Sequence, residues 1–244
     1  MNSTVIKAFE IINYISEKQG EVRLVDITND LDMNKTTAFR FLETLESLNI
    51  IEKKSNTYYL GLSLLQLGNK VITRTLLLEK IIPILERISD DVNETVNFAQ
   101  LQGDMALYLH KIDSKRSLQF SLGTGDRLPL YCTAMGKAIL SALPDDKYEN
   151  IVQNIDFRKI TPNTIDNKES LYSEIKSIRA QGFSTEEEEL EEGLICISVP
   201  ITIRMLDFRG AISISGPAFR ISEDTINRLV KRLKTAQSEI INLF

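Results

Sequence analysis

Apolar residues in the first fifty positions recur at the three- to four-residue spacing of amphipathic helices. The first such run predicts a helix from residue 3 to residue 18, with Ser3 as its N-cap. A second, shorter helix is expected over residues 24–31, and a third begins directly after Asn34, a good capping residue. One face of this third helix, at 35–47, is apolar and is made by Ala38, Phe41, Leu42, Leu45 and Leu48.

Two β-prone runs follow these helices. Residues 50–54 and 57–60 flank the turn pair Ser55-Asn56, which predicts a hairpin. Three helices and a hairpin in this order are typical of a winged helix-turn-helix, in which the third helix enters the major groove of DNA. Hydroxyl and cationic side chains are the usual contacts to phosphates and base edges. The candidate DNA-contacting residues are Lys35, Thr36, Thr37, Phe39, Arg40, Lys53 and Lys54.

The charge of this segment leaves a second interpretation open. Residues 1–62 carry seven Lys and Arg against nine Asp and Glu, a net charge of −2, which is unfavourable for a polyanion binder. A small helical dimerisation domain with a solvated polar face would fit that balance. However, the acids lie mostly in the first two helices, and residues 33–42 contain Lys35 and Arg40 but no acid. This distribution favours DNA binding.

The remaining chain alternates between helical and strand-like segments. Strands grouped as hairpins with helices packed on them indicate an α+β domain on an antiparallel sheet. We therefore expect a winged helix-turn-helix at 1–61, a linker helix at 62–74 and an α+β domain at 75–244. Within that last domain, helices are expected at 76–92, from near Thr133, at 167–181 between the capping box Asp166–Glu169 and Gly182, and after Ser222; strands are expected at 94–101, 105–113, 117–122, 183–188, 194–204 and 210–215.

The stretch LYCTAMGKAIL at 130–140 places a Gly-Lys pair at the start of an apolar, helix-like run. A nucleotide-binding phosphate loop needs a glycine five residues before this pair and Ser or Thr directly after it. Those positions hold Tyr131 and Ala138, so the segment lacks both the glycine that lets the loop wrap a triphosphate and the hydroxyl that binds magnesium. A helix start near Thr133 would still present unpaired N–H groups to one small anion.

Composition narrows the class of protein. The chain has 244 residues, 43% hydrophobic and 26% charged, which is ordinary for a globular protein of one or two domains. The net charge of −5 argues against a surface coated with basic residues but allows a local DNA-contacting face. No apolar run reaches the ~18 residues of a membrane span, and MNSTVIKAFE does not have the pattern of a signal peptide. With only Cys132 and Cys196 and no CxxC motif, we expect a cytoplasmic protein with no disulfide framework, metal site or cofactor.

Several polar residues stand in otherwise apolar runs of the second half. Ser213 and Ser215 alternate in AISISG, so both project from one face of a strand. Cys196 lies in the apolar run LICISVP, shortly after the acidic residues 186–189. Each feature alone has an ordinary structural explanation. Serines on a strand are usually solvated, a cysteine in an apolar run is usually an unreactive core residue, and an acidic run is usually a solvent-exposed loop. As alternatives to a DNA-binding regulator, the two cysteines leave open an enzyme with a cysteine nucleophile or a cysteine-based redox sensor. The enzyme would need a base beside the cysteine, and the single histidine, His110, is a poor candidate for it.

Taken together, these segments resemble the IclR family of bacterial transcription regulators over nearly the whole chain. In the first part the resemblance rests on NKTTAFRFLETLESLNIIEK and YYLGLSLLQLG. In the second part it rests on ETVNFAQL, RLPLYCTAMGKAILSALP, EEEELEEGLICISVPI and AISISGPAFRIS. The last three, in this order and spacing, are specific to the family, whereas a helix-turn-helix alone would not be.

The resemblance implies a winged helix, a linker helix and an effector-binding domain of GAF-like fold, with no catalytic activity. It also implies a homodimer or tetramer that binds a palindromic double-stranded operator, represses or activates a catabolic operon, and senses a small organic acid. Asp is common in the family where this chain has Glu186, so the ligand is expected to be smaller or differently posed. Effector contacts are implied for the backbone of Ala134 and Met135 and for the side chains of Glu186, Cys196, Ser213 and Ser215.

Overall fold

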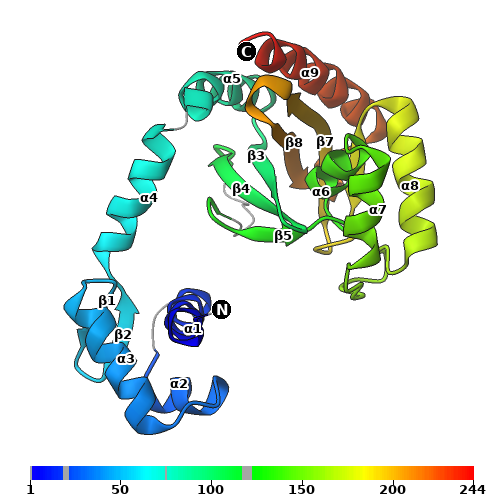
Figure 1. Cartoon of the computed structure of the whole chain (residues 1–244). Coiled ribbons are helices and arrows are strands. Elements are labelled where there is room, and N and C mark those ends of the chain that lie inside the picture. The colour runs from blue at the N-terminus through cyan, green and yellow to red at the C-terminus, as the bar shows by residue number, and fades with distance from the viewer. Residues whose placement is uncertain (1, 19–21, 75, 117–122) are drawn as a thin grey trace. The chain divides into compact units, whose positions relative to one another are not determined.

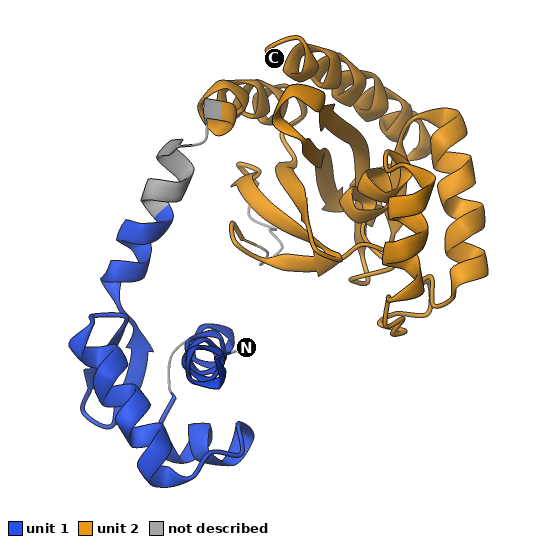
Figure 2. Cartoon of the chain, viewed as in Figure 1, with its two compact units in different colours: residues 1–76 blue, residues 77–244 orange. Residues whose placement is uncertain are grey.

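The computed structural model describes residues 2–18, 22–74, 76–116 and 123–244 (Figure 1). The chain divides into two compact units, Met1–Leu76 and Leu77–Phe244, which are coloured separately in Figure 2. Each unit has a hydrophobic core of its own. Across the described part of the chain, the helices are too short or too polar to cross a membrane.

Unit 1 contains the predicted three helices and hairpin, followed by one more helix. Its buried core comes from the apolar faces of the first three helices and from the hairpin. Val22 adds a single antiparallel bridge to Tyr58, which makes the hairpin a small three-stranded wing. The elements are α1 (Ser3–Glu17), α2 (Leu24–Asp30), α3 (Lys35–Ser47), β1 (Ile51–Lys54), β2 (Thr57–Leu60) and α4 (Leu62–Arg74).

The helix ends of unit 1 correct two details of the sequence analysis. The N-cap of α1 is Asn2, whose side chain accepts a hydrogen bond from the Thr4 N–H at 3.0 Å; Ser3 is already helical. Leu48 is 60% exposed, because α3 ends at Ser47 and Leu48 is its C-cap, beyond the buried stretch of the helix. The cap of α3 is as predicted: Asn34 Oδ1 accepts the Thr37 N–H at 2.8 Å.

Unit 2 is built on one six-stranded sheet in the order β5-β4-β3-β8-β7-β6, and every neighbouring pair is antiparallel. This confirms the predicted α+β class. The central strands β3, β8 and β7 are long and mostly buried, since both faces of the sheet are covered. The strands are β3 (Thr95–Gln102), β4 (Met105–Ile112), β5 (Arg127–Pro129), β6 (Ser184–Glu187), β7 (Leu194–Ile203) and β8 (Phe208–Pro217).

The two faces of the sheet belong to two hydrophobic clusters. Val96 and Phe98 point into the cluster made with α5 (Leu76–Val92) and α9 (Glu223–Ile241). The opposite face packs under α6 (Ala134–Ser141), α7 (Asp145–Gln153) and α8 (Lys168–Gln181), as Figure 1 shows. Because side chains alternate between faces along a strand, neighbours of Val96 and Phe98 point towards α6.

Several elements of unit 2 differ from the sequence prediction. β5 and α7 were not predicted; α7 begins after Pro144, with no side-chain cap to mark its start. The N-cap of α8 is Asn167, whose Oδ1 accepts the Ser170 N–H at 2.9 Å, and not Asp166. Gly182 ends that helix in the left-handed region at φ 79°, as expected. The strand expected at 117–122 lies outside the described residues.

Candidate functional site

Two adjacent rows of polar side chains cross the middle of the sheet on its α6 side. Strand register places residues of four neighbouring strands directly beside one another, and alternate residues of each strand share a face. These side chains are buried, except that Cys196 is partly buried. Across β3, β8, β7 and β6, one row contains Asn97, Ser213, Ser198 and Ser184, and the other contains Thr95, Ser215, Cys196 and Glu186.

A small cavity lies where these rows meet the start of α6. All six residues implied as effector contacts line it, together with Thr95, Asn97, Tyr108 and Lys111. The structure therefore brings the whole predicted set together, although the set comes from four separate stretches of sequence. The cavity volume is only about 20 Å³, which is room for about one water molecule. In this conformation, which we call closed, the cavity has no room for a larger ligand.

The start of α6 presents backbone N–H groups to this cavity. Thr133 is the N-cap: its hydroxyl accepts the Gly136 N–H at 3.1 Å and donates to the Pro129 carbonyl at 2.8 Å. The N–H groups of Ala134 and Met135 precede the first intrahelical acceptor and have no partner within the helix. A side chain at Gly136 would come within 2.4 Å of the Leu130 carbonyl. The glycine is thus required by close packing and not by a phosphate.

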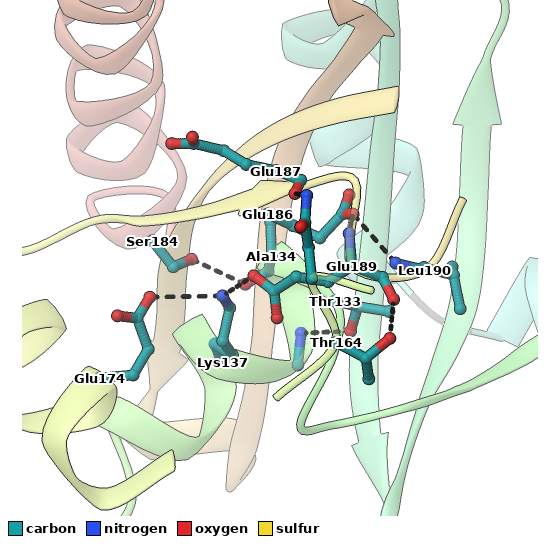
Figure 3. Close-up of polar contacts among 12 residues, drawn as sticks. Thr133, Ala134, Lys137, Thr164, Glu174, Ser184, Glu186, Glu187, Glu189 and Leu190 are labelled. Atoms are coloured by element: carbon teal, nitrogen blue, oxygen red, sulfur yellow. Dashed lines mark hydrogen bonds and ion pairs between the residues drawn. The ribbon is translucent and has the colours of Figure 1, made fainter. Parts of the chain in front are cut away.

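Lys137, directly after that glycine, is enclosed among carboxylates (Figure 3). Its Nζ donates to Glu189 Oε1 and lies 3.3 Å from Glu174 Oε1. Lys137 is 1% exposed and Glu189 is 7% exposed, so water screens this pair poorly. Lys137 was not among the predicted site residues, although a lysine inside the apolar run AMGKAIL is a visible signal.

The segment after β6 closes the cavity and is fixed by buried polar groups. Glu186 Oε1 accepts the N–H groups of Glu189 at 2.7 Å and of Leu190 at 3.1 Å. The Thr161 hydroxyl donates to the Glu188 carbonyl at 2.6 Å, and the Thr164 hydroxyl donates to the Glu189 carbonyl at 2.6 Å. Burial raises the pKa of both the Glu186 and the Glu189 carboxyl above the usual value. Removing the proton from either group therefore costs more here than in water.

Neither thiol has the environment of a reactive cysteine. Burial raises the pKa of Cys132 to about 12, and burial followed by the charge of Glu186 raises the pKa of Cys196 well above its usual value. A nucleophilic or redox-sensing thiol needs the opposite shift, towards the thiolate. Within the described residues there is also no group of three or more His, Cys, Asp or Glu side chains arranged to hold a metal ion.

In unit 1 the candidate DNA-contacting residues lie on the solvent side of α3 and β1. Lys35, Thr36 and Arg40 are exposed, Phe39 is 40% exposed, and Thr37, whose N–H donates to the Asn34 cap, is partly buried. On the wing, the Lys53 ammonium lies 5.4 Å from the Tyr58 ring centre and that of Lys54 lies 5.5 Å from the Tyr59 ring centre. Asp32 makes the turn before α3 at φ 47°, a conformation that aspartate tolerates.

Asn97 and Thr95 line the cavity but were not among the predicted site residues. Both stand in ETVNFAQL, where they alternate with the apolar Val96 and Phe98. This is the same alternation that drew attention to the two serines of β8, so the signal was present. The partners of Asn97 could not be read from it, because the pairing of β3 with β8 joins residues more than a hundred positions apart.

Comparison with known proteins shows to which class of protein the chain belongs. The model of the IclR helix-turn-helix domain matches residues 4–68, and that of the bacterial transcriptional regulator IclR C-terminal domain matches residues 69–242. The chain is therefore a two-part helix-turn-helix regulator, and it belongs to the IclR family of bacterial transcription regulators.

Individual relatives and solved structures match the chain along nearly its full length. The HTH-type transcriptional regulator KdgR of Escherichia coli K12 is 33% identical over 240 residues, covering 98% of this chain and 91% of KdgR. The crystal structure of Thermotoga maritima IclR has a TM-score of 0.78 at 29% identity, covering 99% of this chain and 98% of that one. A transcriptional regulator of Rhodococcus sp. RHA1 has a TM-score of 0.84 at 28% identity, with the same coverage of both chains.

Proposed function

We propose that this chain regulates transcription of a catabolic operon in response to a small carboxylic acid bound in the cavity of unit 2. The observation that carries the proposal is the convergence of hydrogen-bond donors there. The first N–H groups of α6, the hydroxyls of Ser213 and Ser215 and the Tyr108 hydroxyl all border the same space. Burial raises the pKa of Tyr108 well above its usual value, so this hydroxyl stays neutral and can donate.

Glu186 limits the kind of acid that fits. An ionised Glu186 would repel a carboxylate placed directly against it, so the ligand carboxylate belongs at the α6 end of the cavity. The Glu186 end suits a hydroxyl, since a carboxylate accepts hydrogen bonds from hydroxyl groups. We therefore propose a keto, hydroxy or sugar acid as the effector class.

The closed cavity supplies a means of signalling. An organic acid is much larger than the single water that the cavity accommodates, so its binding requires residues 186–190 or their supports to move. A ligand shifts an equilibrium between two conformations only if it binds one of them better. In this proposal the acid binds an opened conformation better than the closed one described above.

Unit 1 provides the DNA-binding half of the proposal. The exposed start of α3 would enter the major groove, and Lys53 and Lys54 would contact phosphates beside it. Two copies of the chain, related by a two-fold axis, would read an inverted repeat. The cysteine-based alternatives have no support, because both thiols have raised pKa values.

Titration calorimetry of the full chain against a panel of keto, hydroxy and sugar acids tests the effector half directly. Charge-assisted hydrogen bonds contribute about 1.5–3 kcal/mol each, so Ser213→Ala and Ser215→Ala should each weaken the best acid about tenfold or more. A double serine variant that binds this acid as well as the parent would place the ligand elsewhere. Operator binding measured with and without the acid then tests whether the ligand controls DNA affinity.

A further inference from the structure

Asn97 on β3 holds both serines of β8 with a single side-chain amide. Its Nδ2 donates to Ser213 Oγ at 3.2 Å and to Ser215 Oγ at 3.1 Å. Ser213 lies directly opposite Asn97 in the antiparallel register, and Ser215 is the diagonal neighbour on the same face. All three side chains are at least nine-tenths buried, and all three border the cavity.

This arrangement decides which way the serine hydroxyls act. An amide nitrogen carries two hydrogens, and a serine oxygen has two acceptor sites and one hydrogen. Once Asn97 occupies an acceptor site on each oxygen, each hydroxyl hydrogen must turn to another acceptor. Neither hydroxyl donates to any group in the described part of the chain, so both hydrogens are left for the contents of the cavity.

Besides the serines, the lining contains further hydrogen-bond donors and one carboxylate. The α6 N–H groups and the Tyr108 hydroxyl are donors as well, and the one carboxylate of the lining, Glu186, already has its Oε1 engaged by two backbone N–H groups. An amide oxygen facing the serines would reverse the two central groups, since it would draw their hydrogens out of the cavity. The direction of the Asn97 amide is therefore a property on which the selectivity of the cavity depends.

We propose that Asn97 is the positioning residue that makes the cavity selective for carboxylates over their neutral amides, by orienting the Ser213 and Ser215 hydroxyls as donors. The proposal rests on the acid-binding function proposed above and adds the origin of its selectivity. Asn97 itself need not touch the ligand. It acts by fixing the direction of two serine hydroxyl hydrogens that could otherwise turn about their C–O bonds.

Asn97→Asp is the sharpest test because it keeps the shape and replaces the amide donor by an acceptor. In this variant the serine hydrogens turn towards the introduced carboxylate, and the serine oxygens offer lone pairs to the cavity. Calorimetry should show the best acid of the panel weakened by about tenfold or more. Its carboxamide analogue should bind more tightly than it binds the parent, because an amide NH₂ can donate to the reoriented serines.

The new negative charge would weaken the acid by itself, and a double-mutant cycle removes that contribution. Asn97→Asp is therefore also made in the Ser213→Ala, Ser215→Ala background. That background has no hydroxyls to reorient, so Asn97→Asp acts there only through its charge. The loss of acid affinity caused by Asn97→Asp should be clearly smaller in this background. The uncharged Asn97→Leu serves as the second variant and should reduce the preference for acid over carboxamide without inverting it.

The outcomes separate the two proposals. If the parent binds none of the acids, the proposed function fails, and the role of Asn97 fails with it. If the parent binds an acid, but Asn97→Asp and Asn97→Leu keep its preference for acid over carboxamide, then Asn97 is only structural and this inference alone is wrong. Equal weakening of acid and carboxamide would also overturn it, because lost packing affects both ligands alike.

Discussion

Lys137 and Glu189 form an ion pair inside unit 2 that joins the first turn of α6 to the segment closing the cavity. Glu174 on α8 adds a second, partly exposed carboxylate to the same ammonium. Glu189 Oε2 is buried and has no hydrogen-bond partner in the described part of the chain. The pair therefore connects the start of α6 to residues 186–190, with one of its own acceptor sites unsatisfied.

We expect Lys137→Met to destabilise the protein strongly. Removing one partner of a buried ion pair leaves the other charge uncompensated, which costs about 3–5 kcal/mol. The methionine fills a similar volume, so lost packing contributes little. Urea unfolding of the full chain, followed by circular dichroism, measures the change in the free energy of unfolding.

The matched control is Lys137→Met combined with Glu189→Gln. This double variant contains no unpaired charge at Glu189 and should recover most of the lost stability, since a buried pair is often replaced by neutral groups at little cost. Glu174→Gln alone should have a smaller effect than Lys137→Met, because Glu174 is partly exposed. Equal stability of the parent and Lys137→Met would contradict the importance of the pair.

The raised pKa of Glu186 predicts how stability changes with pH. In the folded state this carboxyl holds its proton more tightly than in the unfolded chain, where its pKa is near 4.5. Between 4.5 and the raised value the folded state binds more protons, so stability falls as pH increases through this window. Glu186→Gln cannot titrate, and its stability should fall less across the same window.

The measurement is the difference between parent and Glu186→Gln in thermal unfolding at several pH values, since other titrating groups contribute equally to both. Glutamine still offers an oxygen to the N–H groups of Glu189 and Leu190, so the segment keeps its hydrogen bonds. A constant difference at all pH values would mean that the Glu186 pKa is the same in the folded and unfolded states.

Both cysteines should react slowly in the native protein. At pH 8 a thiol whose pKa is about 12, as for Cys132, is ionised to about one part in ten thousand, and only the thiolate reacts. Ellman's reagent should therefore label the unfolded chain rapidly and the native chain hardly at all. Rapid native labelling that disappears in Cys196→Ser would support the redox-sensor alternative instead.

Local signals made most of the fold predictable. The spacing of Ala38, Leu42 and Leu45 and the cap at Asn34 define α3 without reference to any other element. By contrast, α7 has a proline at its N-cap and no side-chain capping bond, so its start lacks the capping signal that marks α3. A local capping hydrogen bond, as at Asn34, makes a helix start visible in the sequence, although the caps of α1 and α8 were each placed one residue away, where two capping residues are adjacent.

Six residues of the candidate site could be named from the sequence, but Asn97, Thr95 and the contacts within the site could not. Alternation placed Ser213 and Ser215 on one face, and the family resemblance supplied Ala134 and Met135. That Asn97 controls the hydroxyls depends on which strand pairs with β8 and in which register, and this long-range pairing leaves no local trace. The burial of Lys137 likewise depends on contacts from α8 and from the segment after β6.

DNA binding should depend on Arg40 and Lys53 in different ways. The Arg40 side chain is exposed on α3 and makes no ion pair with any residue that the structure describes, so it is free to meet a base. Arg40→Ala should reduce specific operator affinity by about 1–3 kcal/mol. Lys53→Ala should weaken operator and random DNA alike and lower the salt dependence by about one phosphate contact.

Fluorescence anisotropy with operator and scrambled duplexes at several salt concentrations separates the two effects. Lys231, an outward residue of α9 in unit 2, gives the charge control Lys231→Ala. It should change neither affinity. If Arg40→Ala binds its operator as tightly as the parent at equal salt, α3 does not read the bases.

The last prediction concerns self-association through α4. Leu62 is 69% exposed, Leu65 is 60% exposed and Leu67 is 55% exposed, which is unusual for a helix that faces only water. Leu62 and Leu65 are three residues apart and so share one face of the helix. We expect a second copy of the chain to cover this face in a two-fold dimer.

Replacing Leu62 and Leu65 together by glutamine keeps the length of both side chains and the helix propensity, but removes the apolar contact. Sedimentation velocity should show the parent as a dimer at micromolar concentration and the variant shifted towards monomer. The control is Met205→Gln, because Met205 is even more exposed, at 83%, yet lies in unit 2. On an inverted-repeat operator the α4 variant should also lose affinity, whereas on a single half-site it should bind like the parent, because the contacts of each α3 to DNA are unchanged. A parent that sediments as a monomer with and without DNA would rule out this interface.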